Sequence, residues 1–393
     1  MHPHKQRPTV FLLLLACCLP VWAVADCEVN GQPVNPANGF TTQDKTGIMR
    51  CKDRDSGQLV REQELRAGQF VGLVRYYKNG QIEREYSVNT QGNRDGRSRE
   101  FGPNGQVLLD ETCRNSDVRG ITRSWYPDGS PRRVAFVGDD PRERASAQYT
   151  RNRQLADLAC GPRPLLAPHV DDAALCGFQG KAVVVETFTD SGAPRAANTW
   201  LAGANQKSVS FHGNGKPASV DETVGEQRVQ QSFSAEGAKL KEVVWSLKEK
   251  PAVRLREREF ADSGTLVHEQ VYAMVEVVGQ RQNRLLEETR FYLNGQPKSR
   301  DSFTLDGRLE LRDARQFHDN GQLAAQGRYV VEGRYRERPT GVHQRYSEQG
   351  RLVQENTYND KGNIQRERAW DAAGQPLRDD AVFEDGSRKA FAK

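Results

Sequence analysis

Cysteine is the residue whose type and spacing most clearly indicate chemistry in this sequence, and that chemistry is disulfide formation. Five of the seven cysteines follow the first 25 residues, namely Cys27, Cys51, Cys113, Cys160 and Cys176. Loop length favours the pairs Cys27–Cys51 and Cys160–Cys176, which leaves Cys113 without a partner. Because neither C-x-x-C nor His-x3-His spacing occurs, we predict no metal site.

Histidines and acidic pairs, which carry much of acid–base and metal chemistry, fit surface positions here. His212 and His318 each follow an aromatic residue and lie two positions before Asn in an Asn-Gly pair, so we interpret them as flanking turns. The pair Asp139-Asp140 does not fit an EF-hand register. The sequence also lacks a G-x-S-x-G nucleophile elbow and a phosphate-binding glycine loop. We therefore predict that the protein is not an enzyme and holds no cofactor.

The elements that position these residues are predicted by one repeat: an aromatic residue, three residues, a glycine, one residue and an apolar residue. Thirteen copies follow this pattern, although Lys239 takes the apolar position in one of them. The copies are Tyr76-Gly80-Ile82, Phe101-Gly105-Val107, Trp125-Gly129-Pro131, Phe188-Gly192-Pro194, Phe211-Gly215-Pro217, Phe233-Gly237-Lys239, Phe260-Gly264-Leu266, Phe291-Gly295-Pro297, Phe303-Gly307-Leu309, Phe317-Gly321-Leu323, Tyr346-Gly350-Leu352, Tyr358-Gly362-Ile364 and Trp370-Gly374-Pro376.

The spacing predicts a three-residue hairpin loop. In Pro103-Asn104-Gly105, proline presets the first turn position and glycine supplies the left-handed residue that ends such a loop. Phe101 then faces Val107 across two strands, and such a pair contributes about 0.2–1 kcal/mol. Successive copies lie about 12 residues apart, or about 22–31 where an intervening turn is degenerate, and this spacing is typical of an antiparallel meander. The predicted fold is therefore all-β: an elongated antiparallel meander of repeated β-hairpins forming an open sheet.

Most repeat aromatics are interpreted as sheet core. Where an aromatic is doubled, in Tyr76-Tyr77 and Trp125-Tyr126, one ring of the pair should face away from the other. We expect Tyr77 and Tyr126, together with His212 and His318, to be candidates for contact with a partner.

The first 25 residues predict export. Lys5 and Arg7 precede the apolar run Val10–Cys18, and Ala23–Ala25 forms an A-x-A cleavage site, so residues 1–25 resemble a secretory signal peptide. A lipoprotein signal with attachment at Cys17 is the alternative. We expect a periplasmic or secreted protein, with disulfides formed in an oxidising compartment.

Charge and hydropathy restrict the classes of partner that the protein can bind. The 57 basic and 52 acidic residues are nearly balanced and interspersed, which argues against a nucleic-acid-binding face. No stretch after the predicted signal is long and apolar enough to cross a bilayer. A protein partner is the remaining expectation, and the sequence leaves the oligomeric state open.

The copies divide the chain into blocks. Residues 26–70 form a lead-in with a predicted disulfide, and residues 71–137 hold the N-terminal hairpin repeats. The proline-containing stretch 138–180 breaks the pattern and is predicted to be an irregular insertion or linker with a short helix. Residues 181–393 hold the C-terminal hairpin repeats.

The copies Gly96-x4-Phe101-x3-Gly105, Gly120-x4-Trp125-x3-Gly129 and Gly341-x4-Tyr346-x3-Gly350 resemble the variant MORN repeat. This repeat occurs in bacterial proteins that carry the label of toxin–antitoxin system antitoxins. The resemblance implies a non-catalytic repeat scaffold that binds a protein partner, such as an antitoxin or immunity protein neutralising a toxin. The alternative is a cell-envelope scaffold that binds glycan or lipid head groups.

Overall fold

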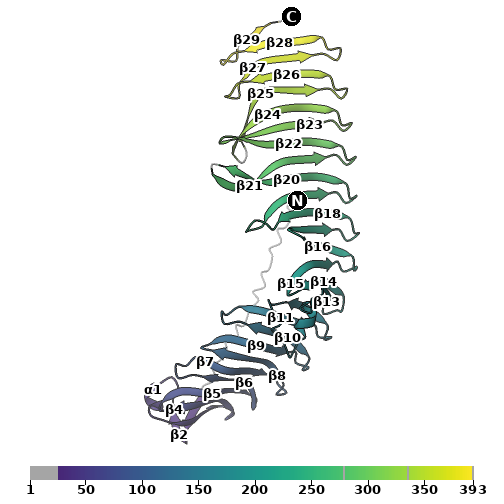
Figure 1. Cartoon of the computed structure of the whole chain (residues 1–393). Coiled ribbons are helices and arrows are strands. Elements are labelled where there is room, and N and C mark those ends of the chain that lie inside the picture. The colour runs from purple at the N-terminus through teal and green to yellow at the C-terminus, as the bar shows by residue number, and fades with distance from the viewer. Residues whose placement is uncertain (1–24, 278, 334–335, 392–393) are drawn as a thin grey trace, which may run out of the picture. The chain divides into compact units, whose positions relative to one another are not determined.

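The computed structural model describes residues 25–277, 279–333 and 336–391, and nearly all of its regular structure is β-strand (Figure 1). The predicted signal peptide, apart from Ala25, and the alternative anchor Cys17 lie outside the described residues. The chain divides into two compact units, residues 1–153 and 154–393. The strands of each unit form an open antiparallel meander, so the predicted fold class is confirmed.

In the first unit, strands β3 to β11 neighbour one another in chain order, and β1 lies between β3 and β2. A one-turn helix, α1 (Gly39–Thr42), joins β2 to β3. The strand bounds are β1 (Ala25–Val29), β2 (Gln32–Val34), β3 (Gly47–Asp53), β4 (Leu59–Arg66), β5 (Gln69–Lys78), β6 (Gln81–Val88), β7 (Arg94–Phe101), β8 (Val107–Arg114), β9 (Asp117–Trp125), β10 (Pro131–Val137) and β11 (Glu143–Tyr149).

The second unit begins with β12 (Leu155–Ala159) and the short helix α2 (Asp172–Leu175), and continues as a 17-stranded sheet. Each strand from β13 to β29 pairs with the next in the chain. The bounds are β13 (Val183–Phe188), β14 (Pro194–Leu201), β15 (Ala204–Phe211), β16 (Pro217–Val224), β17 (Gln227–Phe233), β18 (Lys239–Ser246), β19 (Val253–Phe260), β20 (Leu266–Val277), β21 (Gln280–Phe291), β22 (Pro297–Asp306), β23 (Leu309–Phe317), β24 (Leu323–Gly333), β25 (Arg336–Tyr346), β26 (Leu352–Tyr358), β27 (Ile364–Trp370), β28 (Pro376–Val382) and β29 (Arg388–Ala390).

The repeat glycine ends a tight turn, as predicted. The Gly105 N–H donates to the Gly102 carbonyl at 2.9 Å, and the Gly102 N–H donates to the Gln106 carbonyl at 2.8 Å. Gly105 has φ +74°, a conformation that costs other L-residues about 1–2 kcal/mol. The same hydrogen bond recurs at most copies, so the repeat is a hairpin loop.

The register confirms the predicted pairing of the aromatic with the apolar residue for most copies. Phe101 lies opposite Val107, and Phe317 lies opposite Leu323. In these hairpins the register shifts by one residue next to the aromatic, because the loop adds a bulge.

Two copies form a different turn, and there the predicted pair is wrong. Asn79 and Gly80 both have positive φ and make a two-residue loop, so Tyr77, and not Tyr76, lies opposite Ile82. Gly307 also belongs to a two-residue loop, which places Phe303 opposite Arg312 in place of Leu309. Because a two-residue loop changes the register by one position, the aromatic moves to the other face.

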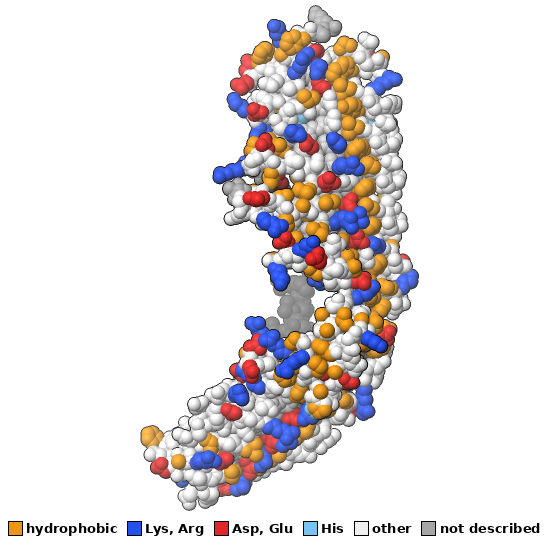
Figure 2. Space-filling view, in the orientation of Figure 1, with side chains coloured by type: hydrophobic (Ala, Val, Ile, Leu, Met, Phe, Trp, Pro, Cys, Tyr) orange, Lys and Arg blue, Asp and Glu red, His pale blue; other side chains and the backbone are white. Residues whose placement is uncertain are grey.

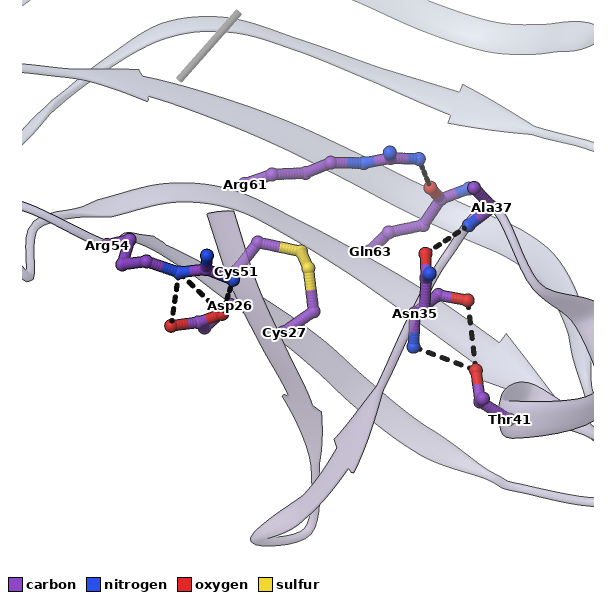
Figure 3. The surroundings of a disulfide bond; sticks show 9 residues. All are labelled: Asp26, Cys27, Asn35, Ala37, Thr41, Cys51, Arg54, Arg61 and Gln63. Atoms are coloured by element: carbon purple, nitrogen blue, oxygen red, sulfur yellow. Dashed lines mark hydrogen bonds and ion pairs between the residues drawn. A yellow bond between two sulfur atoms is a disulfide. The ribbon is translucent and has the colours of Figure 1, made fainter. Parts of the chain in front are cut away.

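Cys27 and Cys51 form a disulfide, as predicted (Figure 3), and the main apolar core of the first unit lies beside it. The disulfide joins the directly opposed strands β1 and β3, and Met49 and Leu65 are fully buried against it. Cys113 remains a buried free thiol, and burial raises the pKa of that thiol.

The sequence predicted an irregular insertion over residues 138–180. Within that stretch β11 and β12 are regular strands, and irregular backbone is concentrated in residues 160–182. The disulfide Cys160–Cys176 closes this segment. The segment packs on the turn after β14, where the Gly203 N–H donates to the Cys176 carbonyl at 2.9 Å. A Cβ on Gly203 would meet the Gly161 carbonyl oxygen at 2.2 Å, so glycine is required at this contact.

One face of the first unit carries a row of alternating charges. Eight directly opposed residues cross β1 and β3 to β9 in the order Glu28, Arg50, Glu62, Arg75, Glu85, Arg99, Asp110 and Arg123. Opposite charges facing each other across strands contribute about 0.2–1 kcal/mol per pair. We call this row the charge ladder, and its cross-strand pairs stabilise this face of the sheet.

The second unit has almost no apolar core beyond β14. After Leu201, the buried hydrophobic residues among those described are only Val243, Val244 and Val330. No second layer of strands or helices is described over β15 to β29. The stability of this sheet therefore rests on hydrogen bonds and cross-strand side-chain pairs.

Candidate functional site

The strongest candidate surface is a row of aromatic and apolar side chains on one face of the second unit, and among its pairs only Lys239 is not apolar. It consists of eight opposed pairs, which we call the apolar band: Phe188–Pro194, Phe211–Pro217, Phe233–Lys239, Phe260–Leu266, Phe291–Pro297, Phe317–Leu323, Tyr346–Leu352 and Trp370–Pro376. Figure 2 shows hydrophobic side chains gathered in a band along the edge of the second unit.

The register fixes all eight aromatics to one face. The residues two positions before the aromatics belong to one unbroken row of directly opposed residues, for example Arg258 with Glu242 and Glu269. Since residues two apart in a strand share a face, the aromatics share it too. At about 4.8 Å per strand, the band extends for about 70 Å.

The band is not buried, which corrects the interpretation of these aromatics as sheet core. All eight rings are half-buried, and Pro194, Pro217 and Pro376 are exposed. Soluble proteins rarely expose contiguous apolar surface of this extent unless it contacts another molecule. The sequence predicted which residues form these pairs, but not how far the rings are exposed.

Charged side chains lie beside the band, two positions before its aromatic residues and farther from the hairpin loops. The Arg258 guanidinium lies 2.7 Å from a Glu269 carboxylate oxygen and 3.6 Å from Glu242. The pKa of the Glu242 carboxyl lies below its usual value: burial opposes this shift, whereas Lys239 and Gln231 favour it by hydrogen bonding. Arg368 lies over the Trp370 ring at 5.8 Å, a cation–π contact that shields one face of the ring. The surface is thus an apolar row beside paired charges.

The two tyrosines predicted as partner contacts bind within the first unit. The Tyr77 hydroxyl donates to Glu62 at 2.6 Å, and burial together with this carboxylate raises the pKa of Tyr77 to about 12. The Tyr126 hydroxyl donates to the Tyr149 carbonyl at 2.9 Å, with Arg151 over its ring. Their polar tips therefore hold neighbouring hairpins together.

The two predicted histidines connect successive turns along one edge of the second unit. His212 Nε2 donates to the Phe233 carbonyl at 2.9 Å, and His318 Nε2 donates to the Tyr346 carbonyl at 3.1 Å. Tyr292 makes the same bond to Phe317 at 2.9 Å. The structure thus brings none of the four predicted contact residues to a common site.

Asparagines extend this turn-to-turn contact, which we call the turn ladder. Asn214, Asn294 and Asn320 each donate to a carbonyl of the next turn on the same edge, at 2.7–2.9 Å. The repeated motif aromatic-[His/Tyr]-x-Asn-Gly was the sequence signal from which these turn-to-turn contacts could have been predicted. These residues satisfy loop carbonyls that would otherwise face water.

Other classes of site find little support in the described part of the chain. No group of three or more His, Cys, Asp or Glu among the described residues could hold a metal ion. Neither of the two helices in the described residues, α1 and α2, is long and apolar enough to cross a membrane. The two disulfides indicate an oxidising compartment, extracellular or periplasmic.

The chain matches no known family model and no curated protein in sequence. Among solved structures it is similar to a chain of the Photorhabdus luminescens Tc holotoxin pore, with 10% identity, a TM-score of 0.19, and coverage of 86% of this chain and 23% of that chain. A TcdB2–TccC3 structure without the hypervariable C-terminal region gives 11% identity, a TM-score of 0.14, and coverage of 88% and 22%. This chain thus spans about a quarter of their length, and similarity at these TM-scores supports no functional argument.

Proposed function

We propose that the protein is an exported, non-catalytic scaffold that binds a protein partner along the apolar band. One observation carries the proposal: seven of the eight pairs of the band are apolar on both strands, Lys239 is the exception, and no strand or helix of the described second unit covers the row. A partner that covers the row gains roughly 25 cal/mol per Å² of apolar surface removed from water.

The paired charges beside the band suit a protein partner. Protein interfaces combine an apolar centre with a polar rim, and a stable one buries about 1,600 Å² in total. The band is long enough to supply this area from one face of the sheet.

The finer proposal is an antitoxin or immunity protein that neutralises a toxin in the periplasm or outside the cell. It is supported by the predicted signal peptide, by the two disulfides and by the resemblance to variant MORN repeats. It also fits the lack of a recognisable catalytic motif in the sequence.

Site-specific photo-crosslinking in the producing cell tests the proposal. A photoreactive residue at Leu266 or Leu323, on the band, should give one discrete adduct with another protein. The same residue at Leu305, which lies on the opposite face, is the matched control. Leu266→Arg and Leu323→Arg should abolish the adduct and restore sensitivity to the toxin. Equal adducts at all three positions, or none at the two band positions, would contradict the proposal.

A further inference from the structure

The regular meander is interrupted in the middle of β24 and β25. Between the pairs Gln326–Gln344 and Arg328–Thr340, β25 advances four residues while β24 advances two. Most other register shifts in this sheet occur beside the hairpin loops and involve one residue. Bulges re-aim side chains and are over-represented next to functional sites.

The bulge lays the His343 imidazole over the backbone of the neighbouring strand. Nε2 of His343 donates to the Arg328 carbonyl at 2.8 Å. A Cβ on Gly327 would lie 2.5 Å from Nδ1 of His343, so only glycine leaves room for the ring. The Tyr329 and Tyr358 rings flank the imidazole, with ring centroids 4.8 and 4.7 Å away in edge-to-face geometry. Three rings from three strands are therefore held in one cluster.

This cluster forms one wall of an open cleft of about 270 Å³. The cleft lies on the face opposite the apolar band, because Ala314 pairs with Gly327 and lies an odd number of positions from Phe317. Small residues, Ala314, Ala325 and Gly327, make the sheet hollow here.

Amide and guanidinium groups supply the polar lining of the cleft. Gln316, Arg345, Gln354 and Asn356 line it, and the lining includes no carboxylate side chain. Within the described residues, the side chains of Gln316 and Arg345 make no hydrogen bond or ion pair, although both backbones pair within the sheet. Asn356 lies directly opposite His343 and approaches the Tyr358 hydroxyl at 3.5 Å. Donors and acceptors thus surround the aromatic wall.

We propose that this cleft binds a saccharide unit. Aromatic rings present flat apolar surface, and amides present a donor and an acceptor in one plane. A sugar offers the complementary chemistry, because its ring has apolar faces and a rim of hydroxyl groups. Hydrolysis of a glycosidic bond uses a pair of carboxyl groups in most such enzymes, and the cleft lining has none, so the site binds and does not cleave.

Titration of the full mature chain with soluble tetrasaccharides of N-acetylglucosamine, glucose and galacturonate, followed by saturation-transfer NMR and calorimetry, tests the proposal. At least one probe should bind with a Kd of about 1 mM or tighter. Gly327→Ala, which displaces the imidazole, and Asn356→Ala should each weaken binding about tenfold. Gln316→Ala, on an exposed side chain, is a milder variant that should weaken binding severalfold without affecting folding.

The cleft and the apolar band can be tested separately, because they lie on opposite faces. Leu266→Arg should leave saccharide binding unchanged, and Gln316→Ala should leave the crosslinked adduct unchanged. Absence of binding to all three probes would overturn the saccharide site, as would binding that is unaffected by Gly327→Ala and Asn356→Ala.

Discussion

Truncation of Asp110 to alanine should destabilise the first unit by about 2 kcal/mol, because this carboxylate is shared by two arginines of the charge ladder face. Arg97 donates to both carboxylate oxygens, with Nε–Oδ1 2.9 Å and Nη2–Oδ2 3.0 Å. Arg123 Nη2 donates to Oδ2 at 2.5 Å. The Asp110 side chain is only 10% exposed, so water replaces these hydrogen bonds poorly.

The magnitude follows from the exposure of the two partners. The Arg97 side chain is 57% exposed, so its pair should contribute a surface value of about 0.5 kcal/mol. The Arg123 side chain is 31% exposed, and a hydrogen bond to a charged group in such a place contributes about 1.5 kcal/mol. Loss of both contacts gives the estimate of about 2 kcal/mol.

Hydrogen exchange of amides in β7 to β9 of the full chain, resolved by mass spectrometry, measures the local opening free energy. A double-mutant cycle with Arg123→Ala should give a coupling of about 1 kcal/mol or more. Asp26→Ala is the matched control, because Asp26 and Arg54 are also paired at 2.7 Å but are 66% and 57% exposed. A change for Asp110→Ala no larger than that for the control, or a coupling near zero, would refute the reasoning.

The same contacts predict a pH dependence. Hydrogen bonding from Arg97 lowers the pKa of Asp110 below its usual value of 3.8, and burial opposes the shift. A carboxyl whose pKa is lower in the folded state stabilises above its unfolded pKa and loses this contribution as pH falls through its folded pKa. The difference in local opening free energy between the wild-type protein and Asp110→Asn should therefore be constant above about pH 5 and shrink below about pH 4.

Three further outcomes follow from the structure. Gly105→Ala should lower the opening free energy of the β7–β8 hairpin by about 1 kcal/mol in hydrogen exchange, because a Cβ there meets open space and only the positive φ is unfavourable. Tyr77 should ionise at about pH 12 in a difference absorbance titration against Tyr77→Phe, and ionisation near pH 10 would contradict its contact with Glu62. Replacement of Cys160 and Cys176 by serine should destabilise the segment between them by about 3 kcal/mol, seen as faster limited proteolysis there.

The sequence predicted the hairpins because the local chemistry of each turn is self-contained. Proline, asparagine and glycine at fixed positions specify the loop at Gly105, and the loop then fixes the pair Phe101–Val107. The predicted pairing is wrong for Tyr76 and Phe303, because Gly80 and Gly307 lie in two-residue loops. Glycine satisfies both loop types, so spacing from the aromatic alone does not distinguish them.

The surfaces were harder to predict than the turns, because they depend on register across many strands. The charge ladder joins residues such as Glu85 and Arg99 only after every hairpin has its final register. The cleft depends on Gly327, which the repeat pattern does not mark, and on a bulge before Gln344. His212 and His318 were correctly placed beside turns, but their hydrogen bonds to the next turn required the spacing of strands in space.

The central claim is that both faces of the second sheet are open, which leaves the apolar band free for a partner. Thiol labelling of the folded chain tests it directly, with Ser208→Cys and Val209→Cys on opposite faces of β15 and Met49→Cys as the buried reference. Peptide-resolved mass spectrometry should find both β15 thiols reacting within about tenfold of an unfolded peptide, with Met49→Cys strongly protected. Protection of either β15 thiol to the level of Met49→Cys would show a covering layer and contradict the account.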